Sequence, residues 1–379
     1  MITLRPYQDQ AAAELTRHRK GIVVVPAGGG KTIIAASAIE RVLRARSVLN
    51  IPRAKIRWIA ATTDQCDQAR KALNIFALFE KADIEIGCPG KIWRVKNPDL
   101  AVIDECHHVP ANSWEDALWD CDRARWGFTA TPFRNDEKTR DIFDIIGNVI
   151  FQIGQDELRA AGAIVPGIVK FTEIAGFVYD LIEKLAKADF EKQHHKFPNI
   201  PKKELLNRCR YRFAKSLGIE KNQDRNAAIT HIAIDQASHE APALLLVGSI
   251  EHGEALLSSI VVLAKLKERD LDDAVLLHSK SKGRKKTVQS FRENRIPLLI
   301  ATSLADEGFD APCASTLILA AGGRAANRVE QRAGRVLRPA PGKTHGMIFD
   351  FMDTQHPFLQ AQSKARARVY KSLGYQILT

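Results

Sequence analysis

The stretch GIVVVPAGGGKTIIAASAIERVL, residues 21–43, joins a β-branched apolar run to a helix-length segment through three consecutive glycines. A strand, a glycine turn and a helix in this order form the setting of a phosphate-binding loop, because glycines let backbone N–H groups close around phosphate oxygens. Lys31 is then expected to reach the β- and γ-phosphates of a nucleotide, and the Thr32 hydroxyl to bind Mg²⁺. Val25 stands where the strict pattern G-x-x-x-x-G-K-[ST] has its first glycine, so a glycine turn without a ligand stays an alternative.

A second stretch supplies the other half of such a site. LAVIDECHH, residues 100–108, is an apolar strand that ends in two adjacent carboxylates. Asp104, at the carboxyl end of a buried strand, is placed to hold Mg²⁺ through water, and Glu105 is placed to orient or deprotonate an attacking water. An acidic turn after a strand is the plainer interpretation, but the glycine loop and the Asp-Glu pair explain each other. We therefore predict an ATP-hydrolysing site that uses Mg²⁺, with phosphates held at Gly28, Gly29 and Gly30.

Short β-rich runs alternate with helix-length segments along most of the 379 residues, which predicts parallel α/β architecture. One series of expected strands is 21–25, 56–61, 83–87, 100–104 and 125–130, and the second is 243–248, 274–278, 297–302, 315–320 and 347–351. We therefore expect two five-stranded sheets in two domains, residues 1–152 and 153–379. Residues 180–235 are polar, basic and mostly helix-like, which fits either a solvated helical excursion or a nucleic-acid contact surface.

The charge of the chain points to a polyanionic partner. Lys and Arg number 56 against 44 Asp and Glu, a formal net charge of +12, and such a surplus favours nucleic acid or an anionic membrane surface. No apolar run reaches the ~18–20 residues of a spanning helix, and the N-terminus lacks the layout of a secretory signal. The six cysteines form no C-x-x-C pair, and Cys106-His107-His108 lacks further metal ligands nearby. We expect a soluble, cytoplasmic protein that does not bind membranes.

DECHH resembles the D-E-x-H box of superfamily-two helicases and translocases. The phosphate loop of that superfamily commonly lacks the first Walker glycine and carries a proline ahead of the remaining glycines, as Pro26 does here. Further motifs follow in the family order across nearly the whole chain. The resemblance implies two RecA-like domains, each a mostly parallel sheet flanked by helices, with a helical excursion in or before the second and ATP bound between the two.

In the first domain the resemblance assigns roles to three more segments. LRPYQDQA, residues 4–11, is similar to the adenine-recognising segment, where Gln8 reads the adenine edge with Arg5 and Tyr7 nearby. WIAATTDQCDQA, residues 58–69, is similar to motif Ia, which contacts the nucleic-acid backbone. GFTATPFR, residues 127–134, matches motif III, T-A-T-P, which couples hydrolysis to motion in the family.

In the second domain the resemblance covers motifs IV, V and VI. LLLVGSIEHGEAL, residues 244–256, is similar to motif IV, and ATSLADEGFDAP, residues 301–312, is similar to motif V. The motif V resemblance implies that Thr302 faces the nucleic-acid backbone, and that the nucleotide cleft is faced by Glu307, Gly308 and Asp310. QRAGRVLRP, residues 331–339, matches motif VI, Q-x-x-G-R-x-x-R. It implies that Gln331 lies at the cleft and that Arg335 and Arg338 act on the γ-phosphate.

Within the superfamily, LRPYQ, DECHH, TATPFR and DEGFD resemble the XPB-like, restriction-motor and phage branch-migrating group. The R-E-D triplet of XPB-like proteins is Arg134-Asn135-Asp136 here, a departure at its middle residue. We expect an ATP-dependent DNA helicase or translocase that contacts the backbone without reading sequence. The alternatives are an RNA helicase, or a nucleic-acid-binding motor subunit whose ATP cleft regulates docking to a separate nuclease.

Overall fold

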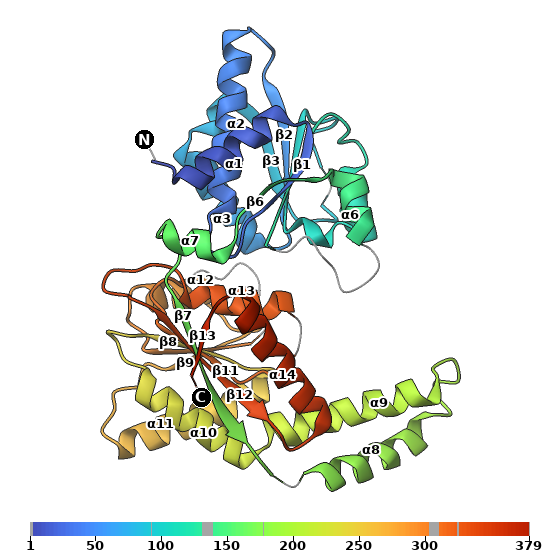
Figure 1. Cartoon of the computed structure of the whole chain (residues 1–379), viewed down its shortest axis with the longest axis vertical. Coiled ribbons are helices and arrows are strands. Elements are labelled where there is room, and N and C mark those ends of the chain that lie inside the picture. Colours follow the sequence, from blue (N-terminus) through green and yellow to red (C-terminus); the bar gives the residue numbers. More distant parts are fainter. Residues whose placement is uncertain are drawn as a thin grey trace. The chain divides into compact units, whose positions relative to one another are not determined.

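The computed structural model describes residues 3–91, 93–130, 139–176, 178–302, 311–323 and 326–378. Its contacts separate two compact units that join in the chain between Ile164 and Val165 (Figure 1). Several residues of the expected site lie outside the described residues. They are Thr131 and Pro132 of motif III, the triplet 134–136, and Glu307, Gly308 and Asp310 of motif V.

The first unit is built around a six-stranded parallel sheet with the order β3-β2-β4-β5-β1-β6. Its strands are β1 (Lys20–Val24), β2 (Ala54–Ile59), β3 (Ala82–Gly87), β4 (Leu100–Asp104), β5 (Arg125–Thr129) and β6 (Val149–Gln152). Its helices are α1 (Pro6–Arg17), α2 (Lys31–Val48), α3 (Thr63–Ile75), α4 (Leu78–Lys81), η1 (Cys106–His108), α5 (Asn112–Leu118), α6 (Thr139–Ile146) and α7 (Gln155–Ala160). Every residue of β4 is buried, as expected for a strand covered by helices on both faces of a parallel sheet.

The second unit has a seven-stranded parallel sheet with the order β13-β7-β12-β11-β8-β10-β9. Its strands are β7 (Gly167–Ile174), β8 (Ala243–Leu246), β9 (Val275–Leu277), β10 (Leu298–Ala301), β11 (Thr316–Leu319), β12 (Gly346–Asp353) and β13 (Gln376–Leu378). Its helices are α8 (Tyr179–Gln193), α9 (Lys202–Phe213), the π-helix η2 (Ala214–Glu220), α10 (Gln223–Gln236), α11 (Ile250–Leu266), α12 (Arg284–Arg292), α13 (Ala326–Val336) and α14 (Pro357–Ser372).

The parallel α/β architecture with two sheets is confirmed, but the expectation of five strands in each sheet was wrong. The missed strands are β6, β7 and β13. β6 and β13 are short edge strands with exposed or half-buried residues, so they lack the continuous apolar run that marks a central strand. Only three residues of β7, GIVKFTEI, are buried, and its polar positions conceal it from a search for apolar runs.

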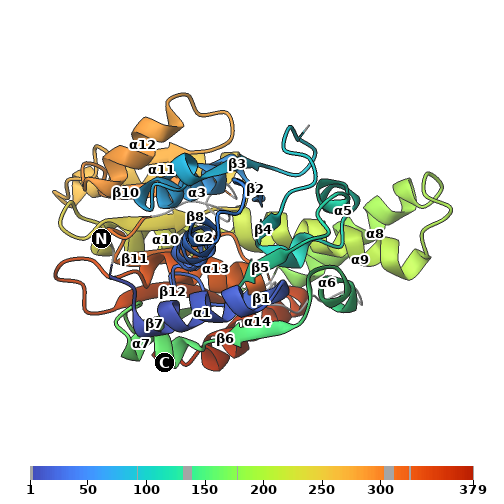
Figure 2. The same cartoon turned by 90° about the horizontal axis from the view of Figure 1, so that it is seen from above.

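The basic stretch 180–235 divides into two parts with different environments. α8 and α9 lie side by side as a hairpin that projects from the second unit, as both Figure 1 and Figure 2 show. α10, by contrast, packs into the core through Ile229, Ala233 and Ile234, and its Arg225 is fully buried. The expectation of a solvated excursion therefore fails for α10. Among the helices of the described residues, none is long and apolar enough to cross a membrane.

Candidate functional site

Three neighbouring strands of the first sheet bring the predicted nucleotide residues to one edge. β4, β5 and β1 are adjacent and parallel, with Asp104 paired to Phe128 and Val24 paired to Thr129. The glycine loop follows β1, the Asp-Glu pair stands at the end of β4, and Thr129 ends β5. The carboxyl ends of parallel strands form the edge at which α/β sheets bind ligands.

The glycine loop has the backbone shape that its glycines allow. Gly28 and Gly30 adopt left-handed conformations with φ of 89° and 81°, which side chains rarely tolerate. Gly30 caps the start of the 18-residue α2, so the first backbone N–H groups of that helix have no partners within it. This helix start carries partial positive charge, which suits an anionic phosphate group.

Val25, the departure from the strict loop pattern, is fully buried and fills the space beneath the loop. A β-carbon added at Gly29 would lie closer to Val25 Cγ1 than any van der Waals contact, and only 3.2 Å from Leu158 Cδ1. A valine at position 25 therefore requires a glycine at position 29. The strict pattern has a glycine at position 25 and accepts a side chain at position 29, whereas this chain has its side chain at Val25 and its glycine at Gly29.

Helix α1 braces the same loop from the side. Tyr7 Oη donates to Gly29 O at 2.8 Å, and Gln8 Nε2 donates to Gly29 O at 3.3 Å. Arg5 N donates to Gln8 Oε1 at 3.0 Å, while Arg5 Nη2 donates to Gly162 O at 3.3 Å. Gln8 thus lies beside the glycine loop, and Arg5 is hydrogen-bonded to Gln8; their role toward adenine stays a prediction. The Tyr7 contact was not foreseen, because a hydrogen bond to a carbonyl 22 residues away leaves no mark in the local pattern.

The predicted charged residues meet below the loop. Lys31 Nζ lies 3.4 Å from Glu105 Oε1, and Glu105 N donates to Asp104 Oδ1 at 3.1 Å. Asp104 and Glu105 are buried, and Glu105 adopts a left-handed φ of 51° that turns the chain after β4. Burial, reinforced by the neighbouring Glu105 charge, raises the pKa of Asp104 to about 7 against the lowering effect of Lys31. The two buried carboxylates suit a divalent cation, and the lysine between the strand end and the loop suits a phosphate.

The three residues after Glu105 contact different parts of the first unit. His107 Nδ1 lies 3.0 Å from Thr129 Oγ1 and 3.5 Å from Glu105 Oε2. His108 stacks on Trp114 with ring centroids 5.8 Å apart. Cys106 is fully buried against Gly127, where a β-carbon would come within 2.9 Å of its sulfur. His107 therefore connects the end of β5 with the carboxylate after β4, a link that the separate motifs did not reveal.

The predicted arginines belong to the second unit. Gln331 and Arg335 lie on α13, and Arg338 follows two residues after its end. Arg335 is buried, whereas Gln331 and Arg338 are half-buried. Thr302 follows β10 and donates its N–H to Leu277 O at 3.2 Å. The structure thus gathers the loop, Gln8, Asp104 and Glu105 in one unit, and holds the three motif VI residues in the other.

Comparisons with known proteins agree with this division. The family described as "Helicase conserved C-terminal domain" matches residues 225–340, and "Type III restriction enzyme, res subunit" matches residues 1–96. Helicase 22 of the Sulfolobus islandicus filamentous virus is 28% identical over 374 residues, which cover 91% of this chain and 62% of that protein. The DNA 3'-5' helicase Rad25 of Halobacterium salinarum is 27% identical over 357 residues, covering 89% of this chain and 52% of that protein. The chain spans 52% to 62% of the length of these two relatives.

A fragment of an HsdR subunit of a type I restriction enzyme from Vibrio vulnificus has the same fold, with a TM-score of 0.63 at 18% identity over 92% of this chain and 64% of that chain. Fold and family matches together define a helicase-type protein of two RecA-like domains. Within that class, the chain is similar to superfamily-two helicases of the XPB and restriction-motor type.

Proposed function

We propose that the chain is an ATP-dependent DNA helicase or translocase that couples ATP hydrolysis to movement on, or remodelling of, duplex or branched DNA. The observation that carries the proposal is the pairing of Lys31 with Glu105 at 3.4 Å, beside Asp104, beneath a glycine loop at a helix start. A lysine, two carboxylates and a ring of backbone N–H groups are the parts that ATP hydrolysis needs.

The Lys31–Glu105 pair suggests how the site responds to nucleotide. In the family, the same ammonium group serves the β- and γ-phosphates, so phosphate replaces Glu105 as its partner. Glu105 is then free to orient a water and accept its proton, and Asp104 and Thr32 are the residues we assign to Mg²⁺. Mg²⁺, when bound, neutralises charge that develops on the phosphates. Gly28, Gly29 and Gly30 supply the backbone around the phosphates.

The remaining assignments follow the family motifs. We assign Arg335 and Arg338 to the γ-phosphate, where an arginine offsets transition-state charge and is worth ~10³-fold or more in rate. Gln331, Gly308 and Asp310 are assigned to the nucleotide cleft, and Gln8 with Arg5 to the adenine side. The 3.0 Å contact from His107 to Thr129 gives a route by which a change at Glu105 reaches the end of β5.

DNA is the proposed partner because relatives over most of the chain are named as DNA helicases, and because the net charge of +12 suits phosphate contacts. Contacts of Lys and Arg with phosphates fix position without reading sequence. An RNA helicase, or a subunit that works with a separate nuclease, makes the same phosphate contacts. The nucleic acid that stimulates hydrolysis separates these functions.

The test is the rate of ATP hydrolysis by the full chain with single-stranded, duplex, forked and four-way DNA and with RNA. We expect DNA to stimulate hydrolysis and RNA to do so weakly. Lys31→Ala is the matched inactive control, because Lys31 serves phosphate and is not part of the apolar core. Hydrolysis that RNA alone stimulates, or that Lys31→Ala retains, contradicts the proposal.

A further inference from the structure

The second unit contains a cavity of about 580 Å³ whose lining, apart from Arg332 of motif VI, lies outside the motifs. It opens between α9, α13, α14 and the turn after β11. Its chemistry combines two aromatic rings, Tyr211 and Phe358, with two guanidinium groups, Arg332 and Arg368. The volume falls within the roughly 300–1,000 Å³ of pockets that take small ligands.

One wall of the cavity is a face of α14. Phe358, Ala361, Ala365 and Arg368 recur at helical spacing along this face and all line the cavity. The two alanines leave room between the ring at one end and the guanidinium at the other. The Phe358 ring is held in place by stacking on His356, with centroids 5.5 Å apart and planes 5° apart. A flat ligand thus meets a fixed ring and a basic group on the same wall.

Tyr211 and the glycine backbone at residues 322 and 323 also line the cavity. The Tyr211 side chain is 42% exposed, although it is a large aromatic ring on α9. Gly323 has a left-handed φ of 97°, and a β-carbon there would meet no atom within 4 Å. Among the described residues, therefore, no atom occupies the space next to the Gly323 α-carbon.

The turn after β11 is held in place by a buried polar network. Gly323 O accepts from Arg366 Nη1 at 2.7 Å, and Gly323 N donates to Gln362 Oε1 at 3.3 Å. Arg366 is buried and paired with Asp350, with Arg366 Nη2 2.9 Å from Asp350 Oδ1. Because α14 holds this turn through buried charge-assisted hydrogen bonds, the cavity is formed in advance of any ligand.

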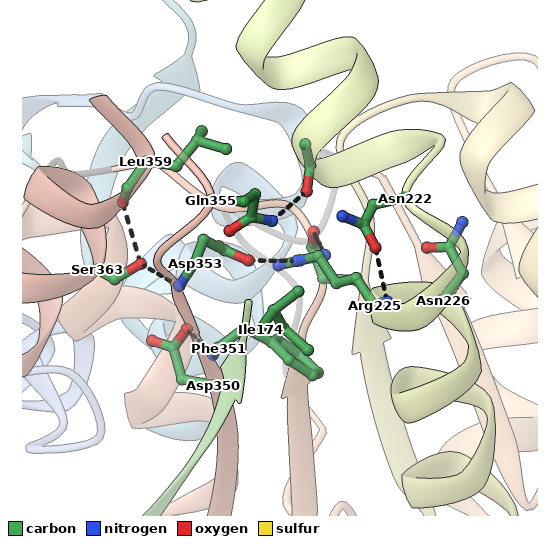
Figure 3. Close-up of polar contacts among 12 residues, drawn as sticks. Ile174, Asn222, Arg225, Asn226, Asp350, Phe351, Asp353, Gln355, Leu359 and Ser363 are labelled. Atoms are coloured by element: carbon green, nitrogen blue, oxygen red, sulfur yellow. Dashed lines mark hydrogen bonds and ion pairs between the residues drawn. The ribbon is translucent and has the colours of Figure 1, made fainter. Parts of the chain in front are cut away.

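The same network continues into α10, as Figure 3 shows. Arg225 Nε donates to Asp353 Oδ1 at 2.8 Å, and Arg225 Nη1 donates to Ala320 O at 2.9 Å. Asp353 N in turn donates to Ser363 Oγ of α14 at 3.1 Å. The ends of β11 and β12 and the cavity wall of α14 are therefore one rigid support.

We infer that this cavity binds an unpaired nucleobase of single-stranded nucleic acid, with the base stacked against Tyr211 and Phe358 and the adjoining phosphate held by Arg368. The inference rests on the proposed function and adds a substrate class to it. Stacking on aromatic rings tolerates every base, because each base has a π-face, and cationic side chains follow the backbone. Double-stranded DNA keeps its bases stacked inside the duplex, so the cavity favours single strands over duplex. An acidic polypeptide offers charge for Arg368 but no flat ring for the two aromatic side chains.

The test compares the affinity of the full chain for fluorescently labelled (dT)20 and for a 20-base-pair duplex by fluorescence anisotropy. Tyr211→Leu is expected to weaken (dT)20 binding about tenfold and duplex binding less than twofold, since one stacking contact is lost. Tyr211→Phe keeps the ring and is expected to bind (dT)20 as the wild type does. Phe197→Leu is the matched control, because Phe197 lies between α8 and α9 and its side chain is 45% exposed, against 42% for Tyr211.

A second readout does not depend on the stability of a variant. Ultraviolet cross-linking of the wild type to an oligonucleotide with one 5-iodouracil is expected to join the base to a peptide containing Tyr211 or Phe358. Equal (dT)20 affinity of Tyr211→Leu and Phe197→Leu, or cross-links confined to other peptides, overturns the inference while the proposed function stands. Binding of poly-glutamate that depends on Tyr211, without (dT)20 binding that does, also overturns it. A wild type that binds no DNA overturns the proposed function and the inference together.

Discussion

Because Val25 occupies the space next to Gly29, we predict that substitutions at these two positions have non-additive effects on the free energy of unfolding. Val25→Ala removes two methyl groups from a fully buried side chain, which costs about 2 kcal/mol of unfolding free energy. Gly29→Ala adds a methyl group against Val25 Cγ1, with Leu158 Cδ1 at 3.2 Å, and overpacking of this kind costs about 1–3 kcal/mol. The φ of Gly29 lies outside the left-handed region, so the backbone itself accepts alanine.

In the double variant the new methyl group enters the space that Val25 vacates. We therefore expect the combined cost to be about 1–3 kcal/mol smaller than the sum of the two single costs. Urea unfolding at constant slope m measures this coupling, and the KM for ATP is expected to rise in Gly29→Ala and to recover in the double variant. Gly28→Ala is the control, because its φ of 89° imposes a strain that Val25→Ala cannot relieve. Additive costs for Val25→Ala and Gly29→Ala refute the packing argument.

Three further predictions concern stability and DNA binding. In the wild type, the fully buried Arg57 guanidinium is paired with the Asp120 carboxylate at 2.5 Å. Asp120→Asn removes that negative charge and is expected to lower the free energy of unfolding by roughly 3–5 kcal/mol, which is a fall in Tm of about 6–20 °C by calorimetry. Asp122→Asn, at an 83% exposed side chain, is the control, and an equal loss in both variants contradicts the prediction. Burial, with the positive charges of Arg225 and Lys215 nearby, lowers the pKa of His252 to about 4 from 6.5. As pH falls, the unfolded chain therefore binds a proton at His252 before the folded chain does. The free energy of unfolding, measured with urea, is expected to drop by about 2 kcal/mol between pH 7.5 and 5, and His252→Gln is expected to remove that drop. An unchanged pH dependence in His252→Gln contradicts the prediction. Duplex binding is expected to weaken with salt at a slope of about −0.9 in log K per phosphate neutralised, and a flat response contradicts phosphate contacts.

The nucleotide edge of the first sheet was predictable because its parts are local in sequence. β1 and β4 are covered on both faces and therefore appear as continuous apolar runs, and the loop and the Asp-Glu pair follow them directly. The parts that sequence reasoning missed depend on contacts between distant positions. Tyr7 reaches Gly29 across 22 residues, and Arg57 reaches Asp120 across 63.

The polar composition of residues 180–235 led to a wrong prediction of solvent exposure for part of that stretch. Arg225 belongs to a basic stretch that suggests a solvated helix, yet it is fully buried because Asp353 neutralises its charge 128 positions later. The cavity between α9 and α14 was invisible for the same reason. Tyr211 and Phe358 stand far apart in sequence and within unrelated patterns, and only the folded chain brings them to one cavity.

The central claim is that Glu105 and Lys31 serve ATP hydrolysis that DNA stimulates. Its most direct test is the ATP hydrolysis rate at saturating DNA for the wild type, Glu105→Gln and Lys31→Ala. Loss of a general base typically costs 10²–10⁴-fold, so Glu105→Gln is expected to hydrolyse ATP at least ~100-fold more slowly while it still binds nucleotide, whereas Lys31→Ala is expected to lose both. Hydrolysis by Glu105→Gln at the wild-type rate, or a wild type that DNA does not stimulate, would contradict the account.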